Sequence, residues 1–236
     1  MVSDLSSIHE IFLMVYYKEF EECNLCEWRC GVNRYKEKGV CGASGVPVVA
    51  SSTLHPAPPA SYDAFMAGCN FKCFFCQNFS ISTYPESEYK REFEGYYEPW
   101  DWARKAIDEL NSDRAKWIGA DRLFFTGGEP TIYLPWIEDV VKEAKKIKKD
   151  IKVNFDTNGF MTVDSLKRVI KISTSITYDI KAFSDRVFRQ LTGACAGPVL
   201  RNAEYLMKYA EDKIWEIRIM IIPGIHNNEV EMLADF

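Results

Sequence analysis

Beyond residue 60, short apolar runs alternate with longer amphipathic stretches. The apolar runs have the length of β-strands and are bounded by turn-forming residues. They are Tyr62–Ala67, Arg122–Thr126, Ile151–Phe155, Ser175–Tyr178 and Ile214–Ile222. We therefore expect five strands in this part of the chain.

Helical patterns fill the intervals between these runs. In Trp136–Lys149 apolar residues recur every three or four positions and lysines fill the opposite face, and Pro198–Glu211 has a similar apolar stripe. A further helix is expected over Asn228–Phe236. Strands that alternate with helices at this spacing pair in parallel through right-handed crossovers. The pattern predicts an α/β fold, a partial (β/α) barrel of parallel strands over residues 61–236.

The first sixty residues have a different composition. Four of the eight cysteines lie there, and the residues around them show little helical or strand periodicity. The stretch Ser51–Ala60 contains three prolines and predicts an extended connection. We call residues 1–60 the cysteine-rich module, with its proline-rich linker at the end.

Composition and charge restrict the class of protein. A chain of 236 residues that is 47% hydrophobic can bury a core without disulfides, and eight cysteines in this length are a lower density than is typical of secreted disulfide scaffolds. The formal charge of -5 argues against a general nucleic-acid surface. No apolar run approaches the length of a membrane span, and no convincing signal peptide begins the chain. We expect a cytoplasmic protein whose thiols are reduced and available as ligands.

Three cysteines follow the first predicted strand in a CxxxCxxC motif: Cys69, Cys73 and Cys76. Three thiolates can hold three corners of a [4Fe-4S] cluster and leave the fourth iron open to a substrate. A tetrahedral zinc site would need a fourth ligand that is not evident here, and buried inert thiols are the other alternative. We call residues 67–78 the cysteine loop.

Short motifs also follow the other predicted strands. They are Thr126-Gly-Gly-Glu-Pro130, Asp156-Thr-Asn-Gly159, Asp179-Ile-Lys181 and Pro223-Gly224. Any one of them could be a simple turn. Because the carboxyl ends of parallel strands in a barrel form one face, their shared position predicts that they meet the cysteine loop around a ligand.

These motifs, in this order, resemble those of radical S-adenosylmethionine (SAM) enzymes, close to the glycyl-radical activating enzymes typified by pyruvate formate-lyase activating enzyme. The resemblance spans roughly Tyr62 to Asn228. Cys76–Ser82 and Asp179–Leu200 are also similar to the AmmeMemoRadiSam branch, whose members carry a cysteine-rich leader. Relative to the family's six strand-helix units, the sixth unit is not evident in this sequence.

The resemblance implies a [4Fe-4S] cluster on Cys69, Cys73 and Cys76, with SAM bound beside it. It places around SAM the residues Gly127, Gly128, Glu129, Asp156, Asn158, Asp179 and Lys181. Glycine backbone can approach a ligand closely and its carbonyls can accept from the SAM ammonium group, Glu129 would add charge, and Lys181 could meet the SAM carboxylate. A glycine-rich strand exit with a solvated glutamate, and a surface lysine, are the alternatives.

Three further side chains have open roles. The resemblance suggests a monovalent-cation site formed by Asp156, Asp179 and Thr157, although from the residues alone the two aspartates could be helix caps or turn formers. Arg218 resembles an arginine at which a peptide substrate docks, and a structural ion pair is the alternative. Cys195 is unassigned, either a small half-buried thiol or a redox group.

The implied reaction is reductive cleavage of SAM to a 5'-deoxyadenosyl radical that abstracts hydrogen from a protein or peptide. Its partners would be an electron donor such as flavodoxin or ferredoxin and that substrate, and the oxygen-labile cluster would require anaerobic conditions. The alternatives are modification or methylation of a small molecule or lipid, and a non-catalytic metal-binding maturation scaffold.

The remaining cysteines, Cys23, Cys26, Cys30 and Cys41, lie in the cysteine-rich module. Their spacing supplies a knuckle, an adjacent ligand and a returning fourth thiolate. Glycine follows Cys30 and Cys41, where the backbone can turn its N–H groups toward sulfur. We expect one four-cysteine site for zinc or mononuclear iron; a second iron-sulfur cluster and a metal-free thiol group are the alternatives.

Overall fold

The computed structural model describes residues 15–226, 229, 231, 232 and 236, and these form a six-stranded sheet in sequence order. The first pair, β1 (Val49–His55) and β2 (Ser61–Met66), is antiparallel. Each later strand pairs in parallel with its predecessor. These strands are β3 (Arg122–Gly127), β4 (Lys152–Thr157), β5 (Ser175–Ile180) and β6 (Ile214–Ile219).

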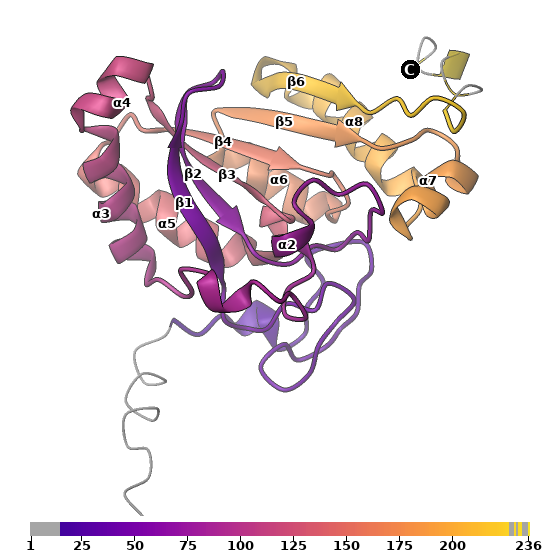
Figure 1. The fold of residues 1–236 in the computed structure, drawn as a ribbon, viewed down its shortest axis with the longest axis horizontal. Helices are drawn as coiled ribbons and strands as arrows, with labels where there is room; N and C mark the ends of the chain where they lie inside the picture. Colours follow the sequence, from indigo (N-terminus) through magenta and orange to yellow (C-terminus); the bar gives the residue numbers. More distant parts are fainter. Residues whose placement is uncertain (1–14, 227–228, 230, 233–235) are drawn as a thin grey trace, which may run out of the picture.

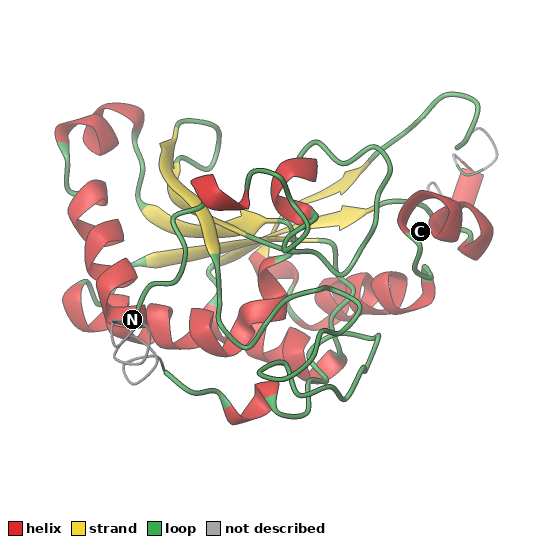
Figure 2. Ribbon diagram, turned by 60° about the horizontal axis from the view of Figure 1, so that its bottom comes forward, coloured by secondary structure: helices red, strands yellow, loops and turns green. Residues whose placement is uncertain are grey.

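The long helices lie on one face of this sheet, as Figures 1 and 2 show. The helices are α2 (Phe79–Ser82), α3 (Pro99–Leu110), α4 (Asp113–Ile118), α5 (Leu134–Ile147), α6 (Val163–Ile172), α7 (Asp185–Thr192) and α8 (Gly197–Tyr209). Short 3-10 turns are η1 (Lys18–Phe20), η2 (Lys90–Glu92), η3 (Pro130–Tyr133) and η4 (Glu211–Lys213). None of the helices in the described residues is long and apolar enough to cross a membrane.

The expected α/β fold with five parallel strands is confirmed. The fifth parallel strand, β6, ends at Ile219 and not at Ile222. The two helices predicted from their apolar stripes are α5 and α8, and α5 begins two residues early because Pro135 sits in its first turn. The helix expected over 228–236 falls largely outside the described residues.

The linker prediction is wrong in part, because residues 49–55 form the edge strand β1. Its centre is the polar run Ser51-Ser52-Thr53, and Ser51, Thr53 and His55 are exposed, so its sequence lacks the apolar run of a buried strand. Pairing with β2 satisfies its backbone over the register Ser51–Phe65 to His55–Ser61. The prolines begin only after this strand, at Pro56.

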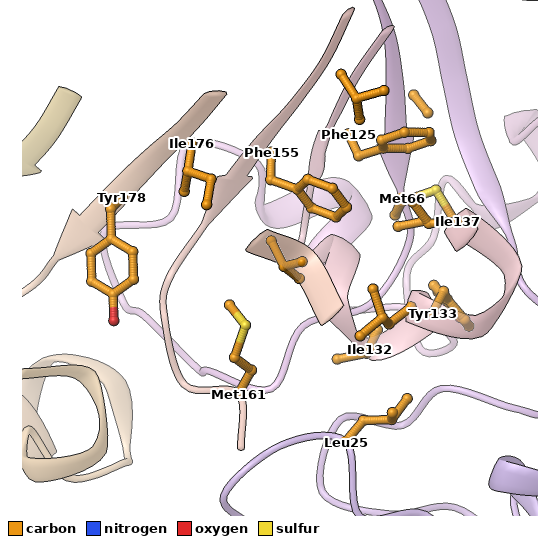
Figure 3. Packing of buried hydrophobic residues seen from close by; sticks show 14 of the residues in the cluster. Leu25, Met66, Phe125, Ile132, Tyr133, Ile137, Phe155, Met161, Ile176 and Tyr178 are labelled. Carbon is orange, nitrogen blue, oxygen red and sulfur yellow. The ribbon is translucent and has the colours of Figure 1, made fainter. Parts of the chain in front are cut away.

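Aromatic side chains fill the space between the sheet and the helices. The Phe125 ring of β3 lies 5.6 Å from the Phe155 ring of β4 and 5.5 Å from the Trp102 ring of α3. Figure 3 shows Phe125 and Phe155 side by side, with Leu25 of the cysteine-rich module on the far side of the cluster. Leu25 and Phe20 belong to the same buried cluster as the strands, so the module packs into the common core.

The other face of the sheet is polar. Successive side chains of a strand point to opposite faces, so Asn154 and Asp156 lie on the face away from Phe155. Asn154 and Thr177 are fully or almost fully buried there, and the Asn154 amide lies 3.5 Å from the Thr177 hydroxyl. The sheet therefore presents an apolar face to the helices and a polar face to the interior of the partial barrel.

Asp63 of β2 makes this polar face sensitive to pH. Burial raises the pKa of Asp63 to about 6, although Ser61 donates a 2.6 Å hydrogen bond to the carboxyl group. Because the folded pKa exceeds the ordinary value near 4, Asp63 contributes stability below about pH 4 that is lost as the pH rises through about 6. At neutral pH the ionised carboxylate costs the folded protein roughly 2 kcal/mol.

We expect Asp63→Asn to raise the free energy of unfolding at pH 7.5 by about 1–2 kcal/mol and to flatten its pH dependence between about pH 4 and 6, because the amide keeps an acceptor for Ser61 without a charge. Denaturant unfolding at several pH values measures this. The exposed Asp108→Asn in α3 is the matched control. Equal pH profiles for the two variants would contradict the prediction.

Candidate functional site

The motifs that follow the parallel strands converge on one cavity of about 420 Å³. Nine of the ten residues predicted for the cluster and SAM line it: Cys69, Cys73, Cys76, Gly127, Gly128, Asp156, Asn158, Asp179 and Lys181. Glu129 does not. The cavity walls also include residues to which sequence reasoning gave no role, namely Phe71, Phe75, Gln77, Asn78, Thr126, Ile219 and Met220.

The surroundings of Cys69 and Cys73 in the cysteine loop favour the neutral thiol in the metal-free protein. Burial raises the pKa of Cys69 well above its usual range and that of Cys73 to about 11, with Lys181 opposing the latter shift. The Phe71 N–H donates to the Cys69 sulfur at 3.4 Å, and the Asn158 amide lies 3.8 Å from it. Because metal ligation deprotonates a thiol, these N–H groups are placed to stabilise a thiolate once iron binds.

The arrangement fits a polynuclear cluster. All three thiols line one cavity. In a [4Fe-4S] cluster each cysteine binds a different iron, so three sulfurs around a shared cavity need not meet at one point.

Glu129 connects the ends of β3 and β4 from beneath the cavity. Its carboxylate is 1% exposed and accepts from the Thr131 N–H and hydroxyl at 3.1 and 2.6 Å, the Thr157 hydroxyl at 2.8 Å and the Asn158 N–H at 2.8 Å. Burial raises the pKa of Glu129 while these four donors oppose the shift. Since these donors occupy the carboxylate, Glu129 positions the two loops, and the structure does not bring it to the cavity as a charge for the ligand.

Positions 127 and 128 require glycine, because the backbone there lies in close contact with β2 and with the cysteine loop. Gly127 has a φ of +115°, and a Cβ on it would overlap the backbone of Met66. A Cβ on Gly128 would overlap the carbonyl oxygen of Gly68. A side chain at Gly127 would therefore disrupt the β2–β3 pairing, and one at Gly128 would displace the cysteine loop. The Gly127 carbonyl accepts a 2.9 Å bond from the Asn78 amide, which fixes the end of the cysteine loop against β3.

Asp156, Asp179, Lys181 and Arg218 form a charge network on the cavity wall. Arg218 pairs with Asp156 and, at 2.8 Å, with Asp179, whose other oxygen lies 2.8 Å from the Lys181 ammonium group. Burial raises the pKa of Asp156, as does Asp179, while Arg218 opposes both effects. Arg218 thus stands between the two carboxylates that the resemblance assigned to a monovalent cation, and that cation stays a prediction.

Cys23, Cys26, Cys30 and Cys41 lie outside this cavity, in the cysteine-rich module. Figure 1 shows the module beside α2 and the carboxyl end of β2. Cys26 and Cys41 are buried, and Cys23 and Cys30 are half-buried. Cys195, between α7 and α8, lies in neither group.

The fold and the cavity define a class of enzyme, and the match to known families agrees. A model of the radical SAM superfamily matches residues 64–236, so the chain belongs to that superfamily. The family resemblance seen in the motifs is therefore confirmed. Membership implies a [4Fe-4S] cluster and SAM as the cofactors of this enzyme.

Particular relatives are more distant. An uncharacterised protein of Methanocaldococcus jannaschii is 30% identical over 224 residues, which are 92% of this chain and 62% of that protein. The pyruvate formate-lyase-activating enzyme of Staphylococcus epidermidis is 23% identical over 187 residues, covering 75% of this chain and 67% of that enzyme. Streptococcus suis SuiB, solved bound to the precursor peptide SuiA, aligns with a TM-score of 0.48 and 22% identity over 71% of this chain and 34% of its own. The chain thus spans about three fifths of the archaeal relative.

We expect Glu129→Gln to destabilise the protein by about 1–3 kcal/mol, because the new amide group must face the backbone N–H of Thr131 or of Asn158 and leave it unpaired. Denaturant unfolding measures the loss. Glu204→Gln, at an exposed position of α8, is the control. A difference between the two variants below about 0.5 kcal/mol would show that the four bonds to Glu129 do not hold the loops.

Proposed function

We propose that the protein uses a [4Fe-4S] cluster to cleave SAM reductively and abstracts hydrogen from a protein or peptide substrate. The observation that carries the proposal is the convergence of Cys69, Cys73 and Cys76 with the Gly127–Gly128 backbone and Lys181 on one cavity. When bound, a reduced cluster with an open iron supplies the electron that converts SAM to methionine and a 5'-deoxyadenosyl radical, which removes a hydrogen atom from the substrate.

The residues of the chain divide this work. Cys69, Cys73 and Cys76 would hold the cluster. The backbone of Gly128 would accept from the SAM ammonium group, and Lys181 would pair with its carboxylate. The walls formed by Phe71 and Phe75 would limit the access of water to the reacting atoms.

The proposal of a protein or peptide substrate rests on similarity to the activating enzyme of pyruvate formate-lyase, whose name states that it acts on another enzyme. An electron donor such as flavodoxin or ferredoxin, a cytoplasmic location and anaerobic conditions belong to the same proposal. Small-molecule or lipid modification and a non-catalytic scaffold remain the competing functions.

Under anaerobic reduction, the iron-reconstituted protein is expected to convert SAM to 5'-deoxyadenosine and methionine. Cys73→Ala should abolish this because it removes a cluster ligand, whereas Cys195→Ala should leave it unchanged. Chromatography of the nucleoside measures the reaction. Full cluster content without any 5'-deoxyadenosine would support the scaffold function and contradict catalysis.

The same assay tests the substrate class. Glycine-containing peptides should raise the rate of 5'-deoxyadenosine formation at least about tenfold over the uncoupled rate, since a positioned substrate removes an entropic barrier to hydrogen transfer. Stimulation by small metabolites or lipids in place of peptides would replace the proposal with the competing enzymatic function.

Lys181→Ala should weaken SAM binding about tenfold, equivalent to about 1.4 kcal/mol, with unchanged iron content. The variant should fold, because Arg218 still pairs with Asp179 when the lysine is gone. Calorimetry with SAM measures the affinity, and Lys142→Ala on the exposed side of α5 is the control. Equal affinities in the two variants would remove Lys181 from the SAM site.

A further inference from the structure

Arg34 is a buried cation without a paired anion. Arg34 is 2% exposed, and none of the carboxylates in the described part of the chain forms an ion pair with its guanidinium. Its guanidinium donates to the carbonyl oxygens of Ser44, at 2.7 and 3.1 Å, and of Ile132, at 2.5 Å. The rings of Phe20 and Tyr133 cover it, with centroids 4.1 and 5.0 Å from the guanidinium carbon.

Carbonyl oxygens and aromatic faces offset part of the cost of burying this charge, but an anion nearby would offset more. Two thiols of the module lie near this charge. The Arg34 guanidinium lies 3.9 Å from the sulfur of Cys23, and it also interacts electrostatically with Cys41.

The other two cysteines of the module belong to the same group. Cys26 lies near enough to Cys23, Cys30 and Cys41 to interact electrostatically with each of them. The Cys30 sulfur packs against Gly39, two residues before Cys41.

Backbone N–H groups also face these sulfurs. Cys26 interacts with the N–H of Trp28, and Cys41 with the N–H of Ala43, each two residues further along the chain. An N–H directed at sulfur from two residues beyond a cysteine stabilises a ligating thiolate and orients it. The same relation holds in the cysteine loop, where the Phe71 N–H donates to Cys69.

We propose that Cys23, Cys26, Cys30 and Cys41 bind one zinc or iron ion as a tetrathiolate, and that Arg34 neutralises part of its charge. Four thiolates around a divalent ion carry a net charge of about -2, which gives the buried guanidinium its missing anion. Among the described residues no three such ligand side chains stand close enough to hold one ion, so binding requires the four sulfurs to move closer together. The half-buried Cys23 and Cys30 are the two that can move most easily. This site does not depend on the proposed function.

The module contacts the cysteine loop, so a metal bound in the module would also affect the position of that loop. The Trp28 indole donates a 2.8 Å hydrogen bond to the carbonyl oxygen of Asn70, between Cys69 and Cys73. The backbone of Glu27 donates to Phe160, and that of Thr162 to Leu25, so the module also binds the segment after β4. A metal that fixes Cys26 therefore fixes the loop that carries the other three thiols.

The experiment counts metal in the full chain with Cys69, Cys73 and Cys76 all changed to Ala, so that only the module can bind it. One equivalent of zinc or iron without sulfide is expected, and cobalt substitution should give the absorption bands of a tetrahedral thiolate complex. Adding Cys41→Ser should remove the metal, whereas adding Cys195→Ser should not. Retention of metal after loss of Cys41, about four irons with sulfide, or no metal at all would each overturn the assignment.

Arg34 is tested in the same background by chelator competition. Arg34→Gln should weaken metal affinity at least about tenfold, whereas Arg34→Lys, which loses the same planar contacts but keeps the charge, should retain more of it. Equal affinities in these two variants would overturn the charge role. Should either variant fail to fold, chelator titration of the unsubstituted protein decides the metal site, since stripping a structural ion must lower its melting temperature.

Discussion

The carboxylate of Glu129 is the interaction on which the site depends. It lies beneath the cavity and joins the turn after β3 to the turn after β4 through four hydrogen bonds. Asn158, which Glu129 holds by its backbone, reaches in turn to the Asn70 side chain at 2.7 Å and so to the cysteine loop. Three segments distant in sequence are therefore held by one buried carboxyl group, which is stable there only while its donors remain in place.

Sequence patterns predicted which loops meet, but not how they are joined. The register of the strands and the shared position of motifs at their carboxyl ends sufficed to bring Cys69, Gly128 and Lys181 to one cavity. The role of Glu129 could not be predicted, because the sequence Gly-Gly-Glu is the same whether the glutamate side chain faces a ligand or the protein interior. One signal was available in the sequence: Glu129 directly precedes Pro130, so its side chain can cap the turn by accepting from the N–H of Thr131, two residues further on.

Neither the edge strand β1 nor the packing of the cysteine-rich module could be predicted from the sequence pattern, and the reasons differ from that for Glu129. An edge strand with one partner and a solvated face needs few apolar residues, so Ser51–Thr53 lacked the expected signal. The module has little periodic structure, and its order comes from long-range contacts such as that of Arg34 with Ile132, 98 positions away. Contacts of this kind depend on the tertiary fold and leave no local pattern in the sequence.

The electrostatics of the cavity indicate an order of assembly. In the metal-free protein burial favours the neutral thiols of Cys69 and Cys73, and Asp156 and Asp179 are matched by Arg218 and Lys181. Iron binding converts thiols to thiolates and adds negative charge next to Lys181, which already interacts with Cys73. Although burial opposes it, Asp179 already raises the pKa of Lys181, so its ammonium group is a cation before the cluster forms. If SAM binds as proposed, at the open iron beside Lys181, cluster formation should precede tight SAM binding.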